Sequence, residues 1–449
     1  MKTRVVSNKD VVSCMRFDGS YHNADVNVYD KVILNHSQHR LSYYCSEIFT
    51  SGRNKRTYTT KEYGYPFLSN SDVVASNPFM SCKYSSKKYG YDEKSVLKRG
   101  MILTGRVGAI GQTAFVPSYL EDAKAMGSDN IIRIVVKPEY RNGFIYAYLA
   151  SKIGNLSFWK HATGGVQPFI TDAMVGDLPI PQFPEAFQQE VDDLIQESAQ
   201  LREEATDALK EAHNMIEHKF LIEGKKKSNC VPITSILTSH NKRFEASYHT
   251  SRNRSVYDYI TQNFDYKKLG ELTERIFRPG IFKREYVSNG VTFLGGADIL
   301  MAIPNSDKKL SFRQVKKMPE LKVKKDWILV TCGGTIGNTV LIDSQLEECV
   351  ISQHVMRVVP KEDVLKGYLY AVLSSRVGHE LITLFTTGSV IPQIESHHLD
   401  LVPIPLLDKQ EMEKIDRLVF TYVSKIEISK EKETRAISMV EDEIEKWNS

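Results

Sequence analysis

Residues 185–223 read EAFQQEVDDLIQESAQLREEATDALKEAHNMIEHKFLIE, and this stretch decides the fold. Apolar or small residues recur in it in alternating steps of four and three, while Glu, Gln, Asp, Lys and Arg fill most other positions. That pattern predicts a long amphipathic helix that pairs with a second helix. The expected seam is Phe187, Val191, Leu194, Ser198, Leu201, Ala205, Ala208, Ala212 and Met215. At ~1.5 Å per residue such a helix spans on the order of 55 Å, more than one domain needs.

A second seam of the same kind closes the chain, in residues 408–449. Its members are Met412, Ile415, Val419, Tyr422, Ile426, Ile437, Val440, Ile444 and Trp447. The eleven-residue step between Ile426 and Ile437 is interpreted as a stutter, which unwinds a supercoil locally without ending the helix. We expect the two helices to pair with each other. The alternative is that each packs only on its own domain.

The composition is that of an ordinary globular chain. With 449 residues, 41% hydrophobic and 25% charged, two or three domains are expected. The net charge of +4 is a weak pointer to nucleic acid, so the location of the cations matters more than their total. Six scattered cysteines without a C-x-x-C pair indicate reduced intracellular thiols. No apolar run is long enough for a signal segment or a membrane span, and we expect a cytoplasmic protein.

The chain is an internal duplication. Six landmarks of its first half return in the same order about 225 residues later. They are RFDGSYH at 16–22 with RFEASYH at 243–249, Ile48-Phe49 with Ile276-Phe277, Phe67-Leu68 with Phe293-Leu294, residues 101–111 with 327–337, residues 143–147 with 367–371, and residues 163–181 with 387–405. Each half is therefore a globular domain followed by one long helix.

Four segments follow from the duplication. They are a first domain at 1–184, a central helix at 185–223, a second domain at 224–407 and a C-terminal helix at 408–449. The join lies at 224–228, where a glycine and a basic run can end the first helix. Inside the domains, short β-branched runs indicate strands and stretches such as 143–152 and 367–376 indicate helices. The fold class is α+β, without the regular strand–helix alternation of a parallel sheet.

The two domains share a scaffold but differ in their basic stretches, 83–91 in one and 308–317 in the other. Clustered Lys and Arg attract phosphates, and a few Arg, Lys, Asn and Gln side chains read base edges. The candidates in the first domain are Arg53, Asn54, Lys55, Arg56, Lys83, Lys87 and Lys88, and in the second Arg278, Lys283, Arg284, Lys308, Lys309, Arg313, Lys316 and Lys317. Any one of them can also be a solvated surface charge. The basic pair Lys55-Arg56 recurs as Lys283-Arg284, which favours phosphate contact for this pair.

We find no set of side chains that is typical of catalysis, of a metal site or of cofactor binding. The nearest matches are Ser76-Asn77-Pro78-Phe79, which lacks the double proline of an amino-methyltransferase box, and the glycines of 105–111, which lack the spacing for pyrophosphate and indicate tight turns. His22 and His249 have no ligand partners at suitable spacing, and we expect hydrogen-bonded structural histidines. His397-His398 occurs in one half only, and Glu217-His218-Lys219 lies on the long helix. We expect no catalytic residues and no metal ligands.

Taken together, the chain resembles the specificity (S) subunits of type I restriction-modification systems. The resemblance covers nearly all of it and rests on the duplicated order, on the Thr-Gly-x(5)-Ile and Pro-Ile-Pro strings that precede each long helix, and on residues 106–111 and 332–337. It implies two target-recognition domains that each read one half of a split sequence in double-stranded DNA. It also implies that the helices form an antiparallel coiled coil that acts as a ruler.

The resemblance further implies partners. Two methyltransferase (M) subunits would dock on the helices and would carry S-adenosylmethionine, and restriction/translocase (R) subunits would join them. ATP and Mg are expected there as well, so no cofactor is expected in this chain. One alternative is the same module in a type IIB-like or phage-defence methyltransferase system. Another, from a different class, is a coiled-coil adaptor that binds protein, and an enzyme that acts alone fits least well.

Overall fold

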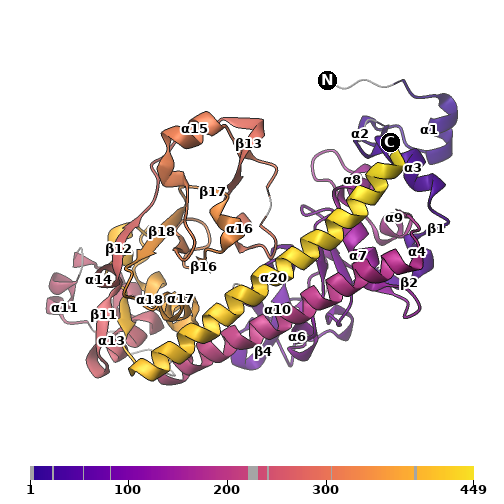
Figure 1. Ribbon diagram of the computed structural model, residues 1–449. Helices are drawn as coiled ribbons and strands as arrows, with labels where there is room; N and C mark the ends of the chain where they lie inside the picture. Colours follow the sequence, from indigo (N-terminus) through magenta and orange to yellow (C-terminus); the bar gives the residue numbers. More distant parts are fainter. Residues whose placement is uncertain are drawn as a thin grey trace. The chain divides into compact units, whose positions relative to one another are not determined.

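The computed structural model describes residues 5–22, 25–53, 55–80, 82–220, 231–239, 242–304, 306–388 and 392–448. It divides into two compact units (Figure 1). Unit 1 comprises residues 1–203 and 428–449, and unit 2 comprises residues 204–427. Asn54 and the join at 224–228 lie outside the described residues, and the domain boundaries expected from the sequence stay a prediction.

The first half of the chain forms short helices and strands and then one long helix. In chain order they are α1 (Asn8–Cys14), α2 (Gly19–His22), η1 (Asp25–Val28), α3 (Asp30–Asn35), β1 (His39–Arg40), α4 (Leu41–Tyr44), β2 (Cys45–Thr50), β3 (Tyr58–Thr59), η2 (Lys61–Tyr63), β4 (Gly64–Leu68), α5 (Asn70–Val73), β5 (Lys83–Ser86), η3 (Glu93–Ser95), β6 (Ile102–Gly105), β7 (Thr113–Phe115), α6 (Ser118–Asp122), β8 (Met126–Gly127), β9 (Ile131–Val136), α7 (Asn142–Ala150), α8 (Lys152–His161), α9 (Asp172–Gly176), β10 (Pro179–Ile180) and α10 (Glu185–Phe220).

The second half repeats this succession and also ends in a long helix. Its elements are α11 (Ile233–Thr238), α12 (Ala246–Thr250), α13 (Arg252–Asn263), β11 (Tyr266–Lys268), α14 (Leu269–Leu272), β12 (Thr273–Phe277), β13 (Tyr286–Leu294), η5 (Asp298–Leu300), β14 (Lys309–Leu310), α15 (Phe312–Lys317), η6 (Pro319–Leu321), β15 (Ile328–Thr331), β16 (Thr339–Leu341), α16 (Ser344–Glu347), β17 (Val350–Ile351), β18 (Val355–Pro360), α17 (Lys366–Ser374), α18 (Arg376–Leu384), α19 (Ser396–Leu399), β19 (Pro403–Pro405) and α20 (Lys409–Asn448).

The sheets show the duplication directly. Unit 1 has an antiparallel sheet in the order β2-β9-β6-β7, and unit 2 has one in the corresponding order β12-β18-β15-β16. A smaller sheet adjoins each, with a parallel pair β4·β8 in unit 1 and β13·β17 in unit 2. Glycines with positive φ recur at corresponding turns, Gly108 with Gly334 and Gly111 with Gly337, as the tight-turn interpretation requires. The expected α+β class with an internal repeat is confirmed.

One arginine lies fully buried in each main sheet, Arg133 on β9 and Arg357 on β18. Each guanidinium donates to four backbone carbonyls, for instance those of Ile131 and Gly127 in unit 1. Burial lowers the pKa of both groups to about 10. Because carbonyls that the strands leave unpaired would cost free energy inside a core, each arginine stabilises the end of its sheet.

The two long helices lie side by side within each unit and run in opposite directions (Figure 1). In unit 1, Glu197 pairs with Lys432 at 2.5 Å. In unit 2, Glu211 pairs with Lys414 at 2.8 Å. Residue numbers rise along α10 as those of its partners on α20 fall. The predicted pairing of the two long helices is therefore confirmed.

The buried stripe of each helix is wider than the seam expected from the sequence. Of the expected members, Val191, Ser198, Ala205, Ala212, Ile415, Val419, Ile426, Val440 and Ile444 are buried, whereas Phe187, Leu194, Leu201, Ala208, Met215, Met412, Tyr422, Ile437 and Trp447 are partly buried. Their neighbours Ile195, Leu209, Ile216 and Val423 are buried as well. The helices bury this additional row because α7 and α8, or α17 and α18, pack against them within the same hydrophobic core.

The stutter predicted between Ile426 and Ile437 is wrong. The buried residues in this interval include Ser429, Glu433 and Ala436, which keep the alternating steps of three and four. The apolar pattern fails there because polar residues occupy buried positions, not because the helix changes its winding.

These polar residues form a cluster with α10 and α7 in unit 1, which we call the polar cluster: Tyr146, Ser198, Arg202, Ser429 and Glu433. The hydroxyls of Ser198 and Ser429 lie 2.9 Å apart, the Tyr146 hydroxyl donates to Glu433 Oε1 at 2.5 Å, and Arg202 forms an ion pair with Glu433. The corresponding positions of the two helices in unit 2 carry Tyr422, Ile426, Ala205 and Leu209. Among the described residues, unit 1 therefore pairs its helices through buried Ser198, Ser429 and Glu433, at positions where unit 2 has Tyr422, Ala205 and Leu209.

Carboxylates on the long helices cap the helices of the globular parts. Asp192 on α10 accepts the Gly143 N–H at the start of α7 at 2.7 Å, and Asp416 on α20 accepts the Gly367 N–H at the start of α17 at 2.7 Å. A Cβ atom on Gly143 would lie 2.6 Å from Asp192 Oδ1, so glycine permits this close approach. An acceptor at a helix N-terminus satisfies a free N–H and favours the helix dipole.

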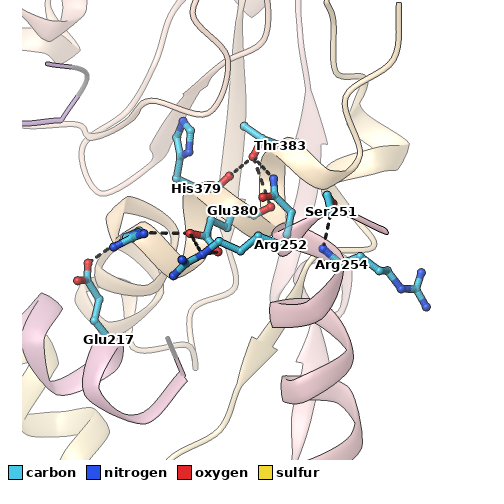
Figure 2. Close-up of polar contacts among 9 residues, drawn as sticks. Glu217, Ser251, Arg252, Arg254, His379, Glu380 and Thr383 are labelled. Carbon is cyan, nitrogen blue, oxygen red and sulfur yellow. Dashed lines mark hydrogen bonds and ion pairs between the residues drawn. The ribbon is translucent and has the colours of Figure 1, made fainter. Parts of the chain in front are cut away.

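The next helix in each unit is capped in the same way from the other long helix. Glu441 on α20 accepts the Lys152 N–H at 2.5 Å, and Glu217 on α10 accepts the Arg376 N–H at 3.0 Å. Figure 2 shows Glu217 at some distance from Glu380, and Arg376 contacts both: its N–H donates to Glu217, and its guanidinium pairs with Glu380 at 3.3 Å. Each unit is thus fixed to both long helices by one carboxylate from each.

We predict that Asp416→Ala lowers the free energy of unfolding by about 1–2 kcal/mol, as loss of a helix cap does. Asp416→Asn keeps the acceptor and should cost less than half of that, because burial raises the pKa of Asp416 and thus already disfavours its charge. Urea unfolding followed by circular dichroism measures both. Equal losses from the two variants would show that the charge, and not the cap, is what stabilises α17.

We predict that Glu433→Leu destabilises unit 1 by ~3 kcal/mol or more, because it leaves Arg202 without its carboxylate. Adding Arg202→Ile should restore most of that loss, since the pair would then resemble the apolar positions of unit 2. Thermal unfolding of both single variants and the double variant gives the coupling. Strictly additive effects would contradict the ion pair as the source of the loss.

Candidate nucleic-acid interface

The candidate cations of the first repeat lie on the small sheet β3-β5-β4-β8 and on the loop that precedes it. Arg53 and Arg56 both form ion pairs with Asp129, whose side chain is 10% exposed. The guanidinium of Arg56 also stacks over the Phe67 ring, 5.4 Å from its centroid. A buried carboxylate needs such partners. These two arginines therefore have a structural role, while Lys55 between them is exposed.

Three lysines of the first repeat lie over tyrosine rings. The Nζ atoms of Lys83, Lys87 and Lys88 are 4.8, 5.5 and 5.1 Å from the centroids of Tyr58, Tyr65 and Tyr89. Lys124, which the sequence analysis did not select, also lies over Tyr65, at 5.7 Å. A ring face holds an ammonium group in place without neutralising its charge. This face of the small sheet can therefore present ordered cations to an anion.

The basic pair repeated in the sequence has the same structure in both units. Arg284 stacks over Phe293 at 5.3 Å, as Arg56 does over Phe67. Its Nη2 donates to Gln353 Oε1 at 3.4 Å, at the position where unit 1 has Asp129. Glutamine carries no charge. At this position the charge of Arg56 is thus compensated by Asp129, whereas Arg284 meets a neutral amide.

The other candidates of the second repeat divide into one that is paired and several that are not. Arg278 pairs with Glu395 at 2.7 Å. In the part of the chain that the structure describes, no carboxylate lies within ion-pair distance of the remaining candidates. Lys309 is partly buried, and the others are exposed: Lys283, Lys308, Arg313, Lys316 and Lys317. Charges without an internal partner are those best able to bind phosphate.

The repeated box RF(D/E)xSYH joins the start of each repeat to the end of a helix, and we call this contact the clasp. Arg16 pairs with Asp18 at 2.6 Å and donates to the Ala162 carbonyl at the end of α8. Arg243 repeats both contacts, with Glu245 and with the Thr386 carbonyl beyond α18. The corresponding histidine of each box hydrogen-bonds the carbonyl of its own arginine, at 2.8 Å for His22 and 2.7 Å for His249. Both histidines are structural.

The weaker sequence matches also have structural roles. Asn77 Oδ1 accepts the Phe79 N–H at 3.1 Å, which closes a turn. His398 Nδ1 accepts the Glu395 N–H at 3.1 Å, which caps α19, and Glu217 caps α18. Among the described residues, no three His, Cys, Asp or Glu side chains are grouped so that they could hold a metal ion. No described helix is both long and apolar enough to cross a membrane.

Sequence comparison identifies the second repeat. Residues 231–438 match the family model described as "Type I restriction modification DNA specificity domain". Residues 231–438, a little under half of the chain, are therefore similar to the specificity domains of type I restriction-modification systems. This match confirms the resemblance seen in the sequence.

Individual relatives agree. The type I restriction enzyme MjaIX specificity subunit of Methanocaldococcus jannaschii is 22% identical over 187 residues, which are 40% of this chain and 42% of that protein. The match therefore spans less than half of the relative's length.

Solved structures of such subunits are similar over most of the chain. The type I S subunit of M. genitalium is 14% identical with a TM-score of 0.32, and the match covers 91% of this chain and 94% of the M. genitalium chain. The HsdS subunit of Thermoanaerobacter tengcongensis is 15% identical with a TM-score of 0.29, and the match covers 91% of this chain and 95% of that subunit. Scores this low place no residue of one chain on a residue of the other.

Proposed function

We propose that this protein is the DNA-recognition subunit of a type I restriction-modification complex, in which each repeat reads one half of a bipartite site in double-stranded DNA. The observation that carries the proposal is a duplicated scaffold with two unlike sets of cations. The first set lies over tyrosine rings on and beside the small sheet. The second set lies around β14 and α15 and has no carboxylate partner among the described residues. Two equal scaffolds with unequal polar surfaces fit an asymmetric target.

The paired helices would set the distance between the half-sites and would dock two methyltransferase subunits. Their ion pairs and the four carboxylate caps support this role, because a ruler must be stiff and firmly joined to what it spaces. Restriction/translocase subunits would join the complex, and S-adenosylmethionine, ATP and Mg would bind to the partner subunits. The chain itself would be non-catalytic and cytoplasmic.

Two other functions remain as alternatives. The module could serve a type IIB-like or phage-defence methyltransferase system, which would use the same two readers. A coiled-coil adaptor that binds protein would also use paired helices. The adaptor leaves the unpaired cations unexplained, and a DNA-binding measurement separates it from the other two.

We predict sequence-specific DNA binding by the full chain that strengthens when a methyltransferase partner is co-expressed. Lys283→Gln and Lys308→Gln should each weaken binding to every DNA sequence and lower the slope of log affinity against log salt by roughly 1, because each would release one phosphate contact. Gel shifts over a range of salt concentrations measure this. Lys210→Gln, an exposed lysine on α10, is the matched control and should change neither. No specific binding in any form would favour the adaptor.

We predict that seven residues inserted after Glu203 and seven after Glu427 lengthen the spacer between the half-sites by about three base pairs. One heptad in each helix preserves the seam and adds ~10 Å, compared with ~3.4 Å per base-pair step. The two positions are those at which α10 and α20 pass from one unit into the other. Selection of binding sites from DNA with random spacers measures the change. An unaltered spacer would show that the helices do not set it.

A further inference from the structure

The two repeats differ in the segment that follows β5 in unit 1 and β14 in unit 2. In unit 1, β5 leads to η3 through residues 87–92, and in unit 2, β14 leads to η6 through residues 311–318. β5 and β14 correspond because each is the antiparallel neighbour of the strand that also forms the parallel pair, β4 or β13. The elements on both sides of the segment match. Between them, unit 1 has a turn and unit 2 has the helix α15 (Figure 1).

The unit 2 segment is a short helix that is firmly held from beneath. Ser311 caps α15 by accepting the Gln314 N–H, Val315 is buried, and Gln314 Nε2 donates to the Lys283 carbonyl at 2.7 Å. The other residues of the helix, Phe312, Arg313, Lys316 and Lys317, are all exposed. Phe312 is 61% exposed, although an apolar ring gains free energy when it is buried. The helix therefore presents an ordered row of one ring and three cations.

The unit 1 segment is a rigid turn with similar chemistry. Ser86 Oγ accepts the N–H groups of Lys88 and Tyr89 at 3.3 Å each, and the Gly90 N–H donates to the Ser86 carbonyl at 2.8 Å. Lys87 is tied back to the Glu62 carbonyl at 3.2 Å. Lys88 lies over Tyr89, which is 67% exposed. Again a fixed backbone presents an exposed aromatic ring beside an available cation.

We propose that residues 311–318 and 87–92 are the base-reading segments, one for each half-site, and that the lysines common to both scaffolds contact only phosphates. This inference rests on the proposed function. Phosphates are alike at every base step, so contacts to them suit the parts that the repeats share. Base edges differ, so the contacts that read them belong to the part in which the repeats differ.

The side chains suit this division. Arg313 can donate two hydrogen bonds to O6 and N7 of a guanine, Lys316 can donate to the same acceptors, and Phe312 can pack on a thymine methyl. Lys55 and Lys283 follow corresponding scaffold positions. Each is an exposed point charge with no carboxylate partner in the described parts of the chain, as phosphate contacts require. The tether from Gln314 holds α15 in one orientation, which a reading helix needs.

The test is selection of DNA from a random library by the full-length chain together with its methyltransferase partner. The variant carries Phe312→Ser, Arg313→Gln and Lys316→Gln, and retains Val315 and Gln314, which hold the helix. We expect the preference for bases in one half-site to change or to fall by roughly tenfold or more at a contacted base pair. The other half-site should stay as it is. Lys88→Gln with Tyr89→Ser should have the converse effect.

Lys283→Gln with Lys308→Gln is the matched control, since it removes two cations of the same repeat from outside the segment. It should weaken binding and leave the selected sequence unchanged. Arg313→Lys keeps the charge but loses the paired donors, so it should alter the base preference while the melting temperature stays within about 1 °C. A selected sequence that none of the segment variants changes, or a change in both half-sites at once, overturns the inference. If the unaltered protein selects no sequence at all, the proposed function fails as well.

Discussion

The caps that the long helices place on the globular parts are the contacts on which the architecture depends. A carboxylate on a long helix accepts a backbone N–H at the start of each of four helices, through Asp192, Glu217, Asp416 and Glu441. A free N–H at a helix N-terminus can donate to almost any acceptor, but only a side chain at the matching position along the neighbouring helix can reach it. Within each unit, the caps therefore hold the globular part at a defined place on the segments of α10 and α20 that belong to the same unit.

The polar cluster determines which of the long helices pair with each other. The seams of the two helices are similar enough that α10 could pair with α10, or α20 with α20, on hydrophobicity alone. Arg202 on α10 and Glu433 on α20 form their ion pair only when α10 faces α20. In a pair of two α10 helices, Arg202 would face Leu209, and in a pair of two α20 helices, Glu433 would face Ile426. A buried charge without its partner is strongly unfavourable. Burying polar groups in unit 1 costs free energy, but it specifies the partner of each long helix.

Periodicity and internal repetition were sufficient to predict the α+β class, the duplication and the pairing of the long helices. They could not give the second buried row of the helices, since Ile195 and Leu209 become buried only when the neighbouring helices pack on them. The stutter was predicted wrongly because the buried residues Ser429 and Glu433 are polar, and a pattern of apolar residues does not include them. The buried arginines Arg133 and Arg357 could have been predicted, because each is a charged residue at the same place in an apolar strand of its repeat.

The candidate interface was predicted less completely than the fold. Sequence shows where cations cluster but not which of them have partners. Arg56 and Arg284 look alike in the sequence. In the described part of the chain, however, only Arg56 faces a carboxylate, Asp129, which comes from a distant loop. The same limit applied to the clasp made by the RF(D/E)xSYH box. Its contacts with the ends of α8 and α18 join segments more than a hundred residues apart in sequence.

The composition of unit 1 has a consequence for biosynthesis. Residues 204–427 are contiguous, so unit 2 can acquire its structure as soon as that stretch has left the ribosome. Unit 1 includes residues 428–449, and its hydrophobic core contains Ala436, Val440 and Ile444. The globular part of unit 1 is therefore translated before unit 2 but completed after it, because the apolar surface of α7 and α8 is covered only once residues 428–449 have been made.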